Sequence, residues 1–565
     1  MSELQAFLDA RQVILTHKDD WAQARALFRW PQLEHFNWAT DYFDAIAQGN
    51  DKPALRILEE DGSVSGLSYT QLSQRSNQVA SFLSDLGAQA GDRMLVMLGN
   101  EVPLWEVMMA AIKMGVVVIP ATTLLSGPDL TDRVQRGRVR WVLTNGSGMA
   151  KVQDLAPQAL GKARCILADA EATLADGWID YQASHRASAT FAAPRLAVTE
   201  PLLEYFTSGT TAAPKLVRHS RQSYPVGHLS TLYWLGLQPD DVHWTISSPG
   251  WAKHAWSCFF APLNAQACIF IYNYTRFDAK TVLDVLVNNR VNTLCAPPTV
   301  WRFLIQADIS QWAVHLRELI SAGEPLNPEV IEQVRKGWGL TIRDGYGQTE
   351  TTALVGNSPG QALKPGSMGR PLPGYPVVLV DADGQAADEG EICIDLSQRP
   401  LSLMDGYADD DSKTATVMRD GYYHTGDVGT RDADGYITYV GRADDVFKAS
   451  GYRISPFELE SALIEHPAVA EAAVVPSPDS LRGYVPKAFV ILAPGHEPNA
   501  ETACAILSDL KARVSPYKMV RRLAFSDLPK TISGKIRRVD LRKQEAQRTD
   551  AGPLEGIEYS DDLLR

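Results

Sequence analysis

The sequence has no apolar run that approaches the ~18 to 20 residues that a membrane-spanning helix requires. Its start, Met1-Ser-Glu-Leu-Gln, has an acidic third residue and no basic segment leading into an apolar core, so it does not resemble a signal peptide. An overall excess of positive charge is also missing, because the formal net charge is -13. These absences predict a cytoplasmic protein without a membrane span, and they argue against a general nucleic-acid or polyanion binder.

Cysteine motifs are missing as well. There is no Cys-x-x-Cys pair and no His/Cys cluster along the sequence. We therefore expect buried thiols rather than a disulfide framework or a zinc site. The cysteines are Cys165, Cys258, Cys268, Cys295, Cys393 and Cys504.

The stretch Tyr205-Phe-Thr-Ser-Gly-Thr-Thr-Ala-Ala-Pro-Lys215 lacks the closing Gly-Lys-Ser/Thr of a Walker A loop, but its composition suits a polyphosphate-binding loop. Gly209 lets the backbone approach a ligand, Lys215 supplies a point charge, and four hydroxyls supply donors. A polar surface turn is the alternative, since short motifs produce false matches. The apolar segment before it predicts that the loop follows a strand. The hydroxyl residues are Thr207, Ser208, Thr210 and Thr211.

The length of 565 residues predicts two or more domains, because single cores stop growing near ~250 to 300 residues. From Arg93 on, strand-length apolar runs alternate with helical patterns, which predicts an α/β body with doubly wound, mostly parallel sheets. Shorter segments after Pro373 predict a small β-rich subdomain. The predicted strands of the body are 94–98, 116–119, 141–144, 165–168, 203–206, 243–246, 267–272 and 292–296, with a helix at 103–114.

The pattern changes after Gly441 to a helix at 456–465 and strands at 473–475 and 488–492. We expect a large N-terminal domain over residues 1–443 and a smaller α+β C-terminal domain over residues 444–565. The polar, acidic tail from about Lys543 is expected to be poorly ordered.

Polar turns elsewhere suggest a nucleotide. In Ile342-Arg-Asp-Gly-Tyr-Gly-Gln-Thr-Glu350, Tyr346 can stack on a base and the final residues can reach phosphate oxygens and a hard cation, with a hairpin tip as the alternative. Asp427 follows a Thr-Gly turn and can accept both hydroxyls of a ribose, or is simply a turn residue. Trp251 is either a pocket wall or a core tryptophan. Lys535 lies in a basic run that is either functional or a solvated chain end.

Five of these stretches, in this order and over almost the whole chain, resemble the adenylate-forming superfamily of acyl-CoA synthetases, peptide-synthetase adenylation domains and firefly luciferase. They are residues 207–215, 345–350, 425–427, 441–453 and 529–535. Five further segments look like the medium-chain acyl-CoA synthetase branch. They are 250–253, 321–325, 346–351, 365–369 and 450–454.

The resemblance implies an AMP-forming carboxylic acid:CoA ligase for a medium-chain, branched or aromatic acid. A carboxylate attacks the α-phosphorus of ATP to give an acyl-adenylate and pyrophosphate, and the thiol of coenzyme A then takes the acyl group. Activation comes first because a carboxylate oxygen is a poor leaving group, whereas AMP is a good one. The implied partners are ATP, Mg²⁺, coenzyme A and a small carboxylic acid, and the resemblance leaves association into a homo-oligomer open.

The resemblance also assigns roles to residues. Lys535 would contact the carboxylate and the α-phosphate, Glu350 would hold the magnesium ion, and Thr207 completes the catalytic group. Asp427 would take the ribose hydroxyls, assisted by Arg442. The implied ATP-binding residues are Thr207, Ser208, Gly209, Thr210, Thr211, Lys215, Gly323, Glu324, Pro325, Asp344, Gly345, Tyr346, Gly347, Gln348, Thr349, Asp427, Arg442 and Lys535.

The same resemblance implies a pocket for the acid and a channel for the thiol. The C-terminal domain would rotate about a hinge at Asp444 between the two half-reactions. Lysine in the position of Lys535 can be acetylated in relatives, which would remove its charge. The implied acid-binding residues are Trp251, Gly323, Gly347 and Thr349, and the implied CoA-binding residues are Ser450, Gly451, Tyr452, Arg453, Arg482 and Arg521.

One departure from the family pattern is Ala212, where the usual phosphate loop has glycine and can take a positive φ at little cost. We still expect activity, because Lys215 and all four hydroxyls remain. Two other functions stay open. An adenylating enzyme that loads a separate carrier protein is one, since the chain has no Gly-Gly-x-Ser carrier site of its own. A silent nucleotide-binding protein is the other, and the presence of Lys535, Glu350 and Asp427 argues against it.

Overall fold

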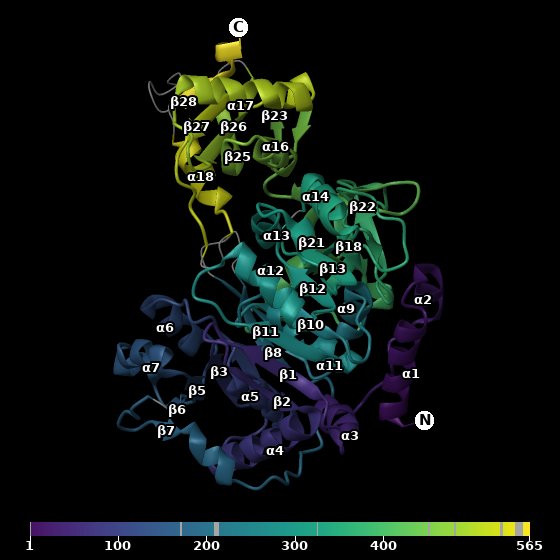
Figure 1. Cartoon of the computed structure of the whole chain (residues 1–565), viewed down its shortest axis with the longest axis vertical. Helices are drawn as coiled ribbons and strands as arrows, with labels where there is room; N and C mark the ends of the chain where they lie inside the picture. The colour runs from purple at the N-terminus through teal and green to yellow at the C-terminus, as the bar shows by residue number, and fades with distance from the viewer. Residues whose placement is uncertain are drawn as a thin grey trace. The chain divides into compact units, whose positions relative to one another are not determined.

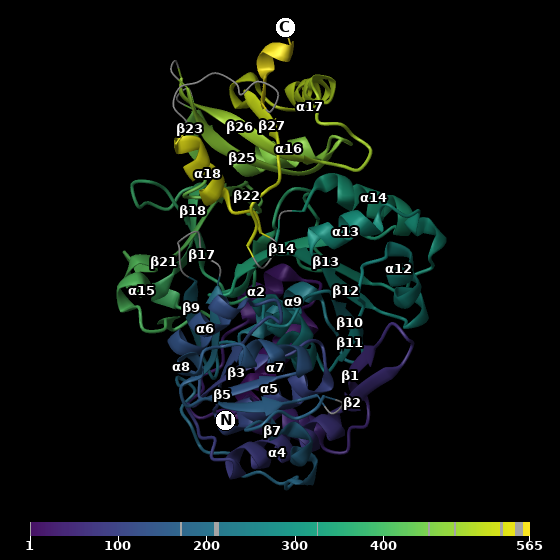
Figure 2. The same ribbon diagram turned by 90° about the vertical axis from the view of Figure 1, so that its left-hand side faces the viewer.

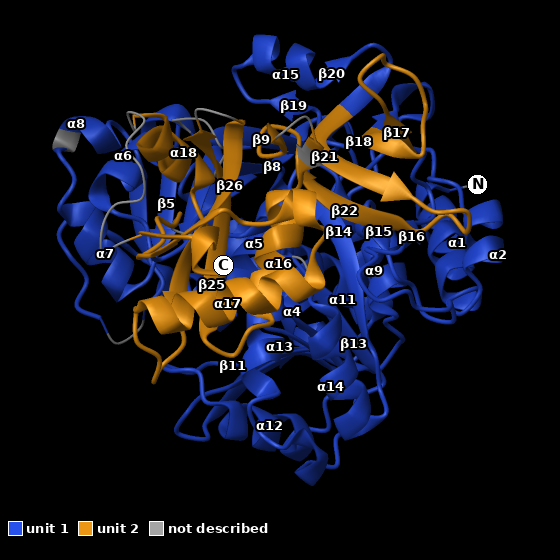
Figure 3. Cartoon of the chain, turned by 90° about the horizontal axis from the view of Figure 1, so that it is seen from above, with its two compact units in different colours: residues 1–207, 214–377, 394–423 blue, residues 208–213, 378–393, 424–565 orange. Residues whose placement is uncertain are grey.

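The computed structural model describes residues 2–169, 172–207, 214–324, 326–449, 452–479, 482–531, 535–547 and 558–564. The chain divides into two compact units, coloured blue and orange in Figure 3. Unit 1 comprises residues 1–207, 214–377 and 394–423, and unit 2 comprises 208–213, 378–393 and 424–565. The domain boundary between residues 443 and 444 stays a prediction, because compactness alone does not identify a hinge.

The first sheet of unit 1 has the order β19-β9-β8-β4-β3-β5-β6-β7. Its centre is parallel: β3 pairs in parallel with β4 and β5, and β4 with β8. In Figures 1 and 2, α5 lies against this sheet. The strands are β3 (Arg93–Met97), β4 (Val117–Pro120), β5 (Trp141–Thr144), β6 (Arg164–Leu167), β7 (Ile179–Asp180), β8 (Pro201–Thr207), β9 (Lys215–Ser220) and β19 (Gly406–Tyr407).

The second sheet of unit 1 has the order β16-β15-β14-β13-β12-β10-β11-β1-β2, with parallel pairing from β14 through β1. Helices α12, α13 and α14 pack against this sheet (Figure 1). The buried apolar core between them includes Trp244, Leu294 and Trp301. The strands are β1 (Pro53–Leu58), β2 (Val64–Ser68), β10 (Val242–Thr245), β11 (Cys268–Tyr272), β12 (Thr293–Ala296), β13 (Glu318–Ala322), β14 (Ile342–Gln348), β15 (Thr352–Gly356) and β16 (Arg370–Pro371).

The helices of unit 1 begin and end at residues with the expected local chemistry. For example, α5 has Pro103 in its first turn and Gly115 at its C-cap with φ 78°, a left-handed conformation that glycine adopts without strain. The helices are α1 (Glu3–Thr16), α2 (Trp21–Leu27), α3 (Asp44–Ala47), α4 (Tyr69–Asp85), α5 (Val102–Met114), α6 (Gly127–Arg136), α7 (Gly146–Gln153), α8 (Pro157–Leu160), α9 (His228–Leu235), α10 (Ala252–Ala255), α11 (Ala261–Ala265), α12 (Ala279–Asn288), α13 (Pro298–Leu304), α14 (Pro328–Trp338) and α15 (Asp411–Val417).

A five-stranded sheet has the order β17-β18-β21-β20, and β22 pairs with β21. Asp427 on β21 lies opposite Arg442 on β22 in antiparallel register. The strands are β17 (Val377–Val380), β18 (Glu389–Asp395), β20 (Met418–Arg419), β21 (Tyr422–Arg431) and β22 (Ile437–Arg442).

The C-terminal part of unit 2 is a four-stranded sheet in the order β25-β26-β27-β28. Alternate residues of β25 face opposite sides: Val474 belongs to the core with α16 and α17, whereas Val475 belongs to the core with α18. A small hairpin of β23 and β24 precedes it. The elements are β23 (Phe447–Ala449), β24 (Tyr452–Ile454), α16 (Pro456–Ile464), β25 (Val469–Asp479), β26 (Gly483–Leu492), α17 (Ala500–Arg513), β27 (Arg522–Phe525), α18 (Arg538–Ala546) and β28 (Glu558–Ser560).

These elements confirm the predicted fold class of an α/β body with mostly parallel sheets and a smaller α+β part. The two strands predicted near 473–475 and 488–492 are much longer than expected. Pro476 and Pro486 interrupt their apolar pattern, yet these two residues lie opposite each other in the β25–β26 ladder. Among the described residues, no helix is both long enough and apolar enough to cross a membrane.

One sequence prediction is wrong, and another needs a distinction. Cys504 is only half-buried, whereas the other five cysteines are buried as expected. Poor order of the tail from Lys543 stays a prediction, but its described residues, 543–547 and 558–564, include the end of α18 and the strand β28. The acidic residues that suggested disorder are buried in ion pairs: Lys487 Nζ lies 2.5 Å from Glu545 Oε1 and 2.6 Å from Glu558 Oε2.

The buried Lys487 cluster predicts a large stability effect. Replacing Lys487 by Met keeps the length of the side chain but removes the nearest cation from two buried carboxylates, which should cost about 3–5 kcal/mol. Lys530 is the matched control, because its pair with Glu471 is over one-third exposed, and Lys530→Met should cost less than ~1 kcal/mol. Urea unfolding of both variants tests this, and equal small losses would contradict the predicted cost of removing the buried cation.

Candidate functional site

The hydroxyl-rich stretch joins two antiparallel strands. Thr207 ends β8 and Lys215 begins β9, and the two residues lie opposite each other in the ladder. This confirms the prediction that the loop follows a strand. The residues between them that were predicted to bind ATP lie outside the described residues, as does Ala212. They are Ser208, Gly209, Thr210 and Thr211.

Lys215 and Glu350 both bond to the hydroxyl of Tyr407. The sequence did not identify Tyr407 as a site residue. Lys215 Nζ donates to the Tyr407 hydroxyl at 3.3 Å, and that hydroxyl donates to Glu350 Oε1 at 3.1 Å. The lysine also lies over the Tyr407 ring, 5.0 Å from its centroid. Tyr407 is in place because β19 pairs with β9. The structure thus joins the predicted phosphate cation and the predicted metal ligand in one hydrogen-bonded chain.

Glu350 lies in a turn whose backbone is held from three directions. The Thr349 carbonyl accepts hydrogen bonds from His219 Nε2 at 2.7 Å and from the Tyr224 hydroxyl at 2.8 Å. The Glu350 carbonyl accepts one from the Met404 N–H at 2.8 Å. Burial lowers the pKa of His219 to about 3, so the ring is neutral, and its bond to a carbonyl requires the proton on Nε2. These contacts fix the position of the Glu350 backbone.

The Gly-Tyr-Gly segment before that turn owes its glycines to packing. A Cβ on Gly345 would lie 2.3 Å from the Trp234 ring, and one on Gly347 would lie 2.0 Å from the Thr352 carbonyl oxygen. The segment belongs to β14, which forms an antiparallel hairpin with β15. The hairpin tip is the turn at residues 349–351, so the hairpin-tip alternative describes Thr349 and Glu350, whereas the Gly-Tyr-Gly segment predicted as part of a polar turn is strand. Gln348 accepts a hydrogen bond from the Tyr423 hydroxyl at 3.0 Å.

Residues predicted to frame the adenine and the acid lie at the carboxyl ends of neighbouring strands. In the β13–β14 register, Ser321 lies opposite Asp344. Gly323 follows Ser321 by two residues, just beyond the end of β13. Gly323 has φ 103° and open space around its α-carbon, so glycine is needed there for its conformation. Glu324 Oε2 accepts a hydrogen bond from Thr299 Oγ1 at 3.1 Å. Pro325 lies outside the described residues.

Asp344 and Lys253 are two titratable groups of this region. Burial raises the pKa of Asp344 to about 8, opposed by the Gly345 N–H at 2.9 Å and by the positive charge of Lys253. Lys253 Nζ donates to the Ala322 carbonyl at 3.0 Å. Trp251 is half-buried at the N-cap of α10, unlike the fully buried tryptophans of the core. Lys253 ends the segment 250–253 that resembles the medium-chain acyl-CoA synthetase branch, but that resemblance assigned it no role of its own.

In unit 2, Asp427 is a nearly buried carboxylate with a fixed orientation. Its Oδ1 accepts hydrogen bonds from Arg442 Nη1 and from the Tyr439 hydroxyl, both at 3.3 Å. The pKa of Tyr439 is well above its ordinary value, mainly because the hydroxyl is buried and also because Asp427 is negatively charged. The hydroxyl therefore keeps its proton and remains a donor. Gly426 has φ 74°, and a Cβ there would lie 2.7 Å from Arg442 Nη2. Tyr439 had no signal in the sequence beyond its place in a strand.

The predicted hinge and the predicted catalytic lysine both belong to unit 2. Asp444 is exposed and lies 3.4 Å from Arg442 Nε. The next residue, Asp445, is buried and pairs with Arg542 of α18. Lys535 is exposed, and its carbonyl accepts a hydrogen bond from the Thr531 N–H at 2.8 Å.

Two of the predicted CoA-binding arginines line one pocket in unit 2, with a volume of about 320 Å³. Arg482 and Arg521 share it with the exposed Tyr517, whose ring lies 4.5 Å from that of Tyr452. The sequence analysis did not identify Tyr517 as a pocket residue, although an aromatic residue between Pro516 and Lys518 could have suggested a binding surface. Ser450 and Gly451 lie outside the described residues, and the side chain of Arg453 is not described.

Comparison with known proteins gives a consistent set of matches. A model of the AMP-binding enzyme family matches residues 42–408, and a model of the AMP-binding enzyme C-terminal domain matches residues 458–535. The chain is 42% identical to 4-hydroxybutyrate--CoA ligase 1 of Metallosphaera sedula, covering 93% of this chain and 94% of that protein. It is 39% identical to the human mitochondrial acyl-coenzyme A synthetase ACSM4, covering 91% of each.

Among solved structures, the anthranilate CoA ligase AuaEII in complex with anthranoyl-AMP is similar to this chain. The superposition has a TM-score of 0.82 at 25% sequence identity, and it covers 90% of this chain and 97% of that chain.

The raised pKa of Asp344 predicts a pH-dependent stability. A carboxyl group whose pKa is higher in the folded than in the unfolded protein contributes stability below its unfolded pKa, and that stability is lost as pH rises through the folded pKa. Wild type should therefore lose melting temperature relative to Asp344→Asn between about pH 4 and 8. Asp405, whose pKa burial raises to about 6, is present in both proteins and cancels in the difference. A constant difference across this range would contradict the raised pKa.

Proposed function

We propose, from the premise that this chain belongs to the AMP-binding enzyme family, that it is an AMP-forming carboxylic acid:CoA ligase. The observation that carries the proposal is the arrangement of Lys215, Tyr407 and Glu350 beside the ends of the hydroxyl-rich hairpin. A cation and a fixed carboxylate next to a loop of donors suit a metal-bound polyphosphate. Loading of a carrier protein is not favoured, since the relatives are named as CoA ligases and synthetases.

The reaction has two steps. A carboxylate oxygen of the acid attacks the α-phosphorus of ATP, forming the acyl–phosphate bond and releasing pyrophosphate. The thiol of coenzyme A then attacks the acyl carbon, loses its proton and releases AMP. The anthranoyl-AMP in the solved structure of the anthranilate CoA ligase is an acyl-adenylate of this kind.

The residues of unit 1 would handle the triphosphate. Lys215 and Thr207 would bind phosphate oxygens, together with the hydroxyls of the loop between them. Glu350 fits a magnesium ligand, because it is a carboxylate with a fixed backbone and hard oxygen atoms, which Mg²⁺ prefers. When bound, Mg²⁺ would offset the charge of the triphosphate. Tyr407 would position Glu350 and Lys215 and make no contact with the reacting atoms.

The adenine of ATP and the carboxylic acid substrate would bind at the carboxyl ends of β13 and β14. Gly323, Glu324 and Tyr346 would frame the adenine, with Asp344, Gly345 and Gln348 around them. Trp251, with Gly347 and Thr349, would border the acid and favour short or flat molecules. The acid is proposed to be a medium-length, branched or aromatic monocarboxylate. The aromatic acid in the name of the anthranilate CoA ligase falls within this range, whereas the short, unbranched 4-hydroxybutyrate in the name of the Metallosphaera sedula relative does not.

Unit 2 would supply the ribose contact and the mobile groups. Asp427 would accept the ribose hydroxyls, with Arg442 and Tyr439 holding its orientation. Lys535 would stabilise charge at the α-phosphate during adenylation, and rotation about Asp444 would replace it with the thiol channel. The pocket of Arg482 and Arg521 would bind phosphates of coenzyme A, because guanidinium groups pair well with phosphate oxygens.

A cytoplasmic location and association into a homo-oligomer stay predictions. The human relative is named as mitochondrial, so similarity does not favour one compartment. Size-exclusion chromatography with light scattering would give the oligomeric state.

The proposed function predicts CoA-dependent release of AMP from ATP. Purified protein should produce AMP and acyl-CoA with at least one member of a panel of short, medium, branched, hydroxylated and aromatic carboxylic acids. Pyrophosphate exchange without coenzyme A separates the two steps. Exchange with an acid but no thioester with coenzyme A would favour a carrier-loading enzyme, and no ATP consumption with any acid would overturn the proposal.

The role of Lys535 predicts a split between the half-reactions. Lys535→Ala should reduce adenylate formation by at least ~100-fold, the size expected for a group that stabilises transition-state charge, while thioester formation from a supplied acyl-adenylate is retained. Lys535→Gln, which imitates acetylation, should behave in the same way because the charge is lost. Lys511→Ala, on the exposed side of α17, is the matched control. Equal loss of both steps would contradict the assigned role.

A further inference from the structure

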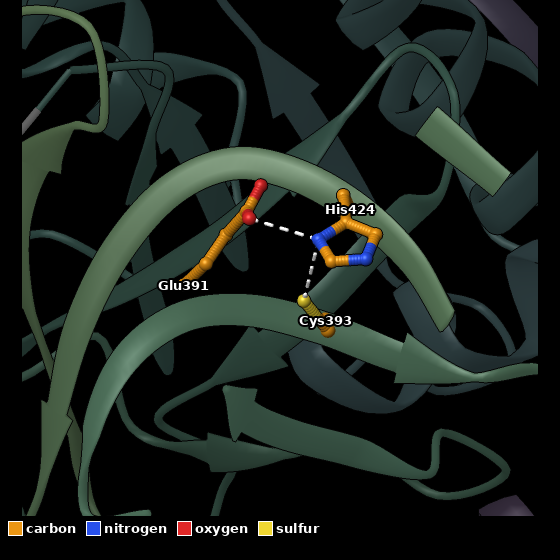
Figure 4. A group of neighbouring side chains, drawn as sticks. All are labelled: Glu391, Cys393 and His424. Atoms are coloured by element: carbon orange, nitrogen blue, oxygen red, sulfur yellow. Dashed lines mark hydrogen bonds and ion pairs between the residues drawn. The ribbon is translucent and has the colours of Figure 1, made fainter. Parts of the chain in front are cut away.

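Three side chains that can bind a metal ion meet between two neighbouring strands of unit 2. Glu391 and Cys393 are two residues apart on β18 and therefore point to the same face of the sheet. His424 lies near the start of β21, the strand beside β18. Figure 4 shows the imidazole directed at both the carboxylate and the thiol.

The distances within this group are short. His424 Nδ1 lies 2.8 Å from Glu391 Oε2 and 3.5 Å from Cys393 Sγ. One ligand atom from each residue lies within 4.8 Å of the others. In tetrahedral zinc sites with the usual bond lengths, neighbouring ligand atoms are separated by about 3.3 to 3.6 Å. The nitrogen–sulfur distance already fits, and the nitrogen–oxygen distance needs to open by about half an ångström.

We propose that Glu391, Cys393 and His424 form a binding site for one zinc-class divalent ion. Thiolate sulfur, imidazole nitrogen and carboxylate oxygen together are the ligands that zinc takes in proteins, whereas magnesium takes oxygen ligands alone. The site is therefore distinct in its chemistry from the magnesium role proposed for Glu350. It belongs to the strands β18 and β21, whereas Glu350 follows β14 in another sheet.

The surrounding backbone orients the ligands. Glu391 Oε1 accepts a hydrogen bond from the Gly426 N–H at 2.8 Å, which leaves Oε2 directed at His424. Thr425 Oγ1 donates to the Ile392 carbonyl at 2.7 Å and so ties β21 to β18 between the ligands. Contacts of this kind fix ligands before a metal arrives and raise the affinity of a site.

The proposed metal site is partly open to solvent through Glu391. Cys393 and His424 are buried, but the Glu391 side chain is 21% exposed. Its carboxylate can therefore move by the small distance that the ion requires, and water can complete the coordination. On binding, the Cys393 thiol would lose its proton to solvent, and His424 would bind through Nδ1 and carry its proton on Nε2. The ion would replace the hydrogen bond between His424 and Glu391.

The same contacts also serve as a hydrogen-bond network that needs no ion, and metal uptake separates the two readings. Full-length protein is stripped with a chelator and titrated with Co²⁺, without ATP, so the result does not depend on ligase activity. We expect one ion per chain with a sulfur-to-cobalt charge-transfer band, displaced by stoichiometric Zn²⁺ and unaffected by excess Mg²⁺. Absence of the band, or its loss to excess Mg²⁺, would overturn the proposal.

Variants assign the ligands. Cys393→Ser should abolish the charge-transfer band, and His424→Gln should weaken Co²⁺ binding by at least ~100-fold, beyond the effect of changing an outer contact. Cys504→Ser is the matched control, because Cys504 is half-buried in the same unit and its thiol bonds to Ser508 and the Leu563 carbonyl, away from the proposed site. A band that survives in Cys393→Ser, or disappears in Cys504→Ser, would contradict the assignment.

The melting temperature is a second readout, and it distinguishes loss of metal binding from loss of folding. Zn²⁺ should raise the melting temperature of wild type and of Cys504→Ser, because a ligand that binds only the folded protein stabilises it. It should leave Cys393→Ser unchanged. If Cys393→Ser does not fold, Glu391→Gln and His424→Gln decide by the same titration, and wild-type affinity in both would overturn the site.

Discussion

The hydrogen-bonded chain from Lys215 through Tyr407 to Glu350 is the interaction on which the proposed chemistry of unit 1 depends. A carboxylate that is largely removed from water is costly unless a donor or a cation compensates it. Here a phenol supplies the donor, and the lysine on its other side supplies the charge. The backbone of the same turn is held by His219, Tyr224 and Met404. Fixed groups of this kind need little reorganisation when charge develops, which is the main physical source of catalysis in such sites.

The same combination of groups occurs around Asp427 in unit 2. There the phenol is Tyr439 and the cation is Arg442, and both bond to one carboxylate oxygen. In each case a tyrosine on a strand of the chain orients an acid that the proposed function assigns to the nucleotide or its metal ion. Tyrosine suits this task because its ring packs in the core while its hydroxyl reaches a polar group. The two acids are therefore anchored before any ligand binds.

Local periodicity was enough to predict most of the central elements of the fold. The strands β3, β4 and β5 and the helix α5 are short, strongly apolar segments, and their pattern needs no knowledge of distant partners. The ends of the loop at Thr207 and Lys215 followed from composition in the same way.

The groups that orient the acids could not be predicted, because strand register brings them together across the sequence. Tyr407 stands 192 residues from Lys215, and nothing near it marks a site. Cys393 and His424 form no motif along the chain, yet adjacent strands place them 3.5 Å apart. The ion pairs of the tail were hidden for a related reason: its acidic composition suggests disorder, whereas Lys487, far away in the sequence on β26, pairs with two of its acids.

The proposed metal ion and the proposed ribose contact share one short segment of β21, residues 424–427, and this has an energetic consequence. Glu391 holds His424 through one oxygen and Gly426 through the other, and Asp427 is the next residue. An ion bound at this group would restrict this segment of β21 and so reduce the entropy lost when a ribose binds to Asp427. Such coupling is reciprocal: if the ion tightens nucleotide binding by some factor, the nucleotide must tighten ion binding by the same factor. Where both proposals hold, metal affinity measured with and without nucleotide therefore reports on the ribose site, even in a variant that performs no chemistry.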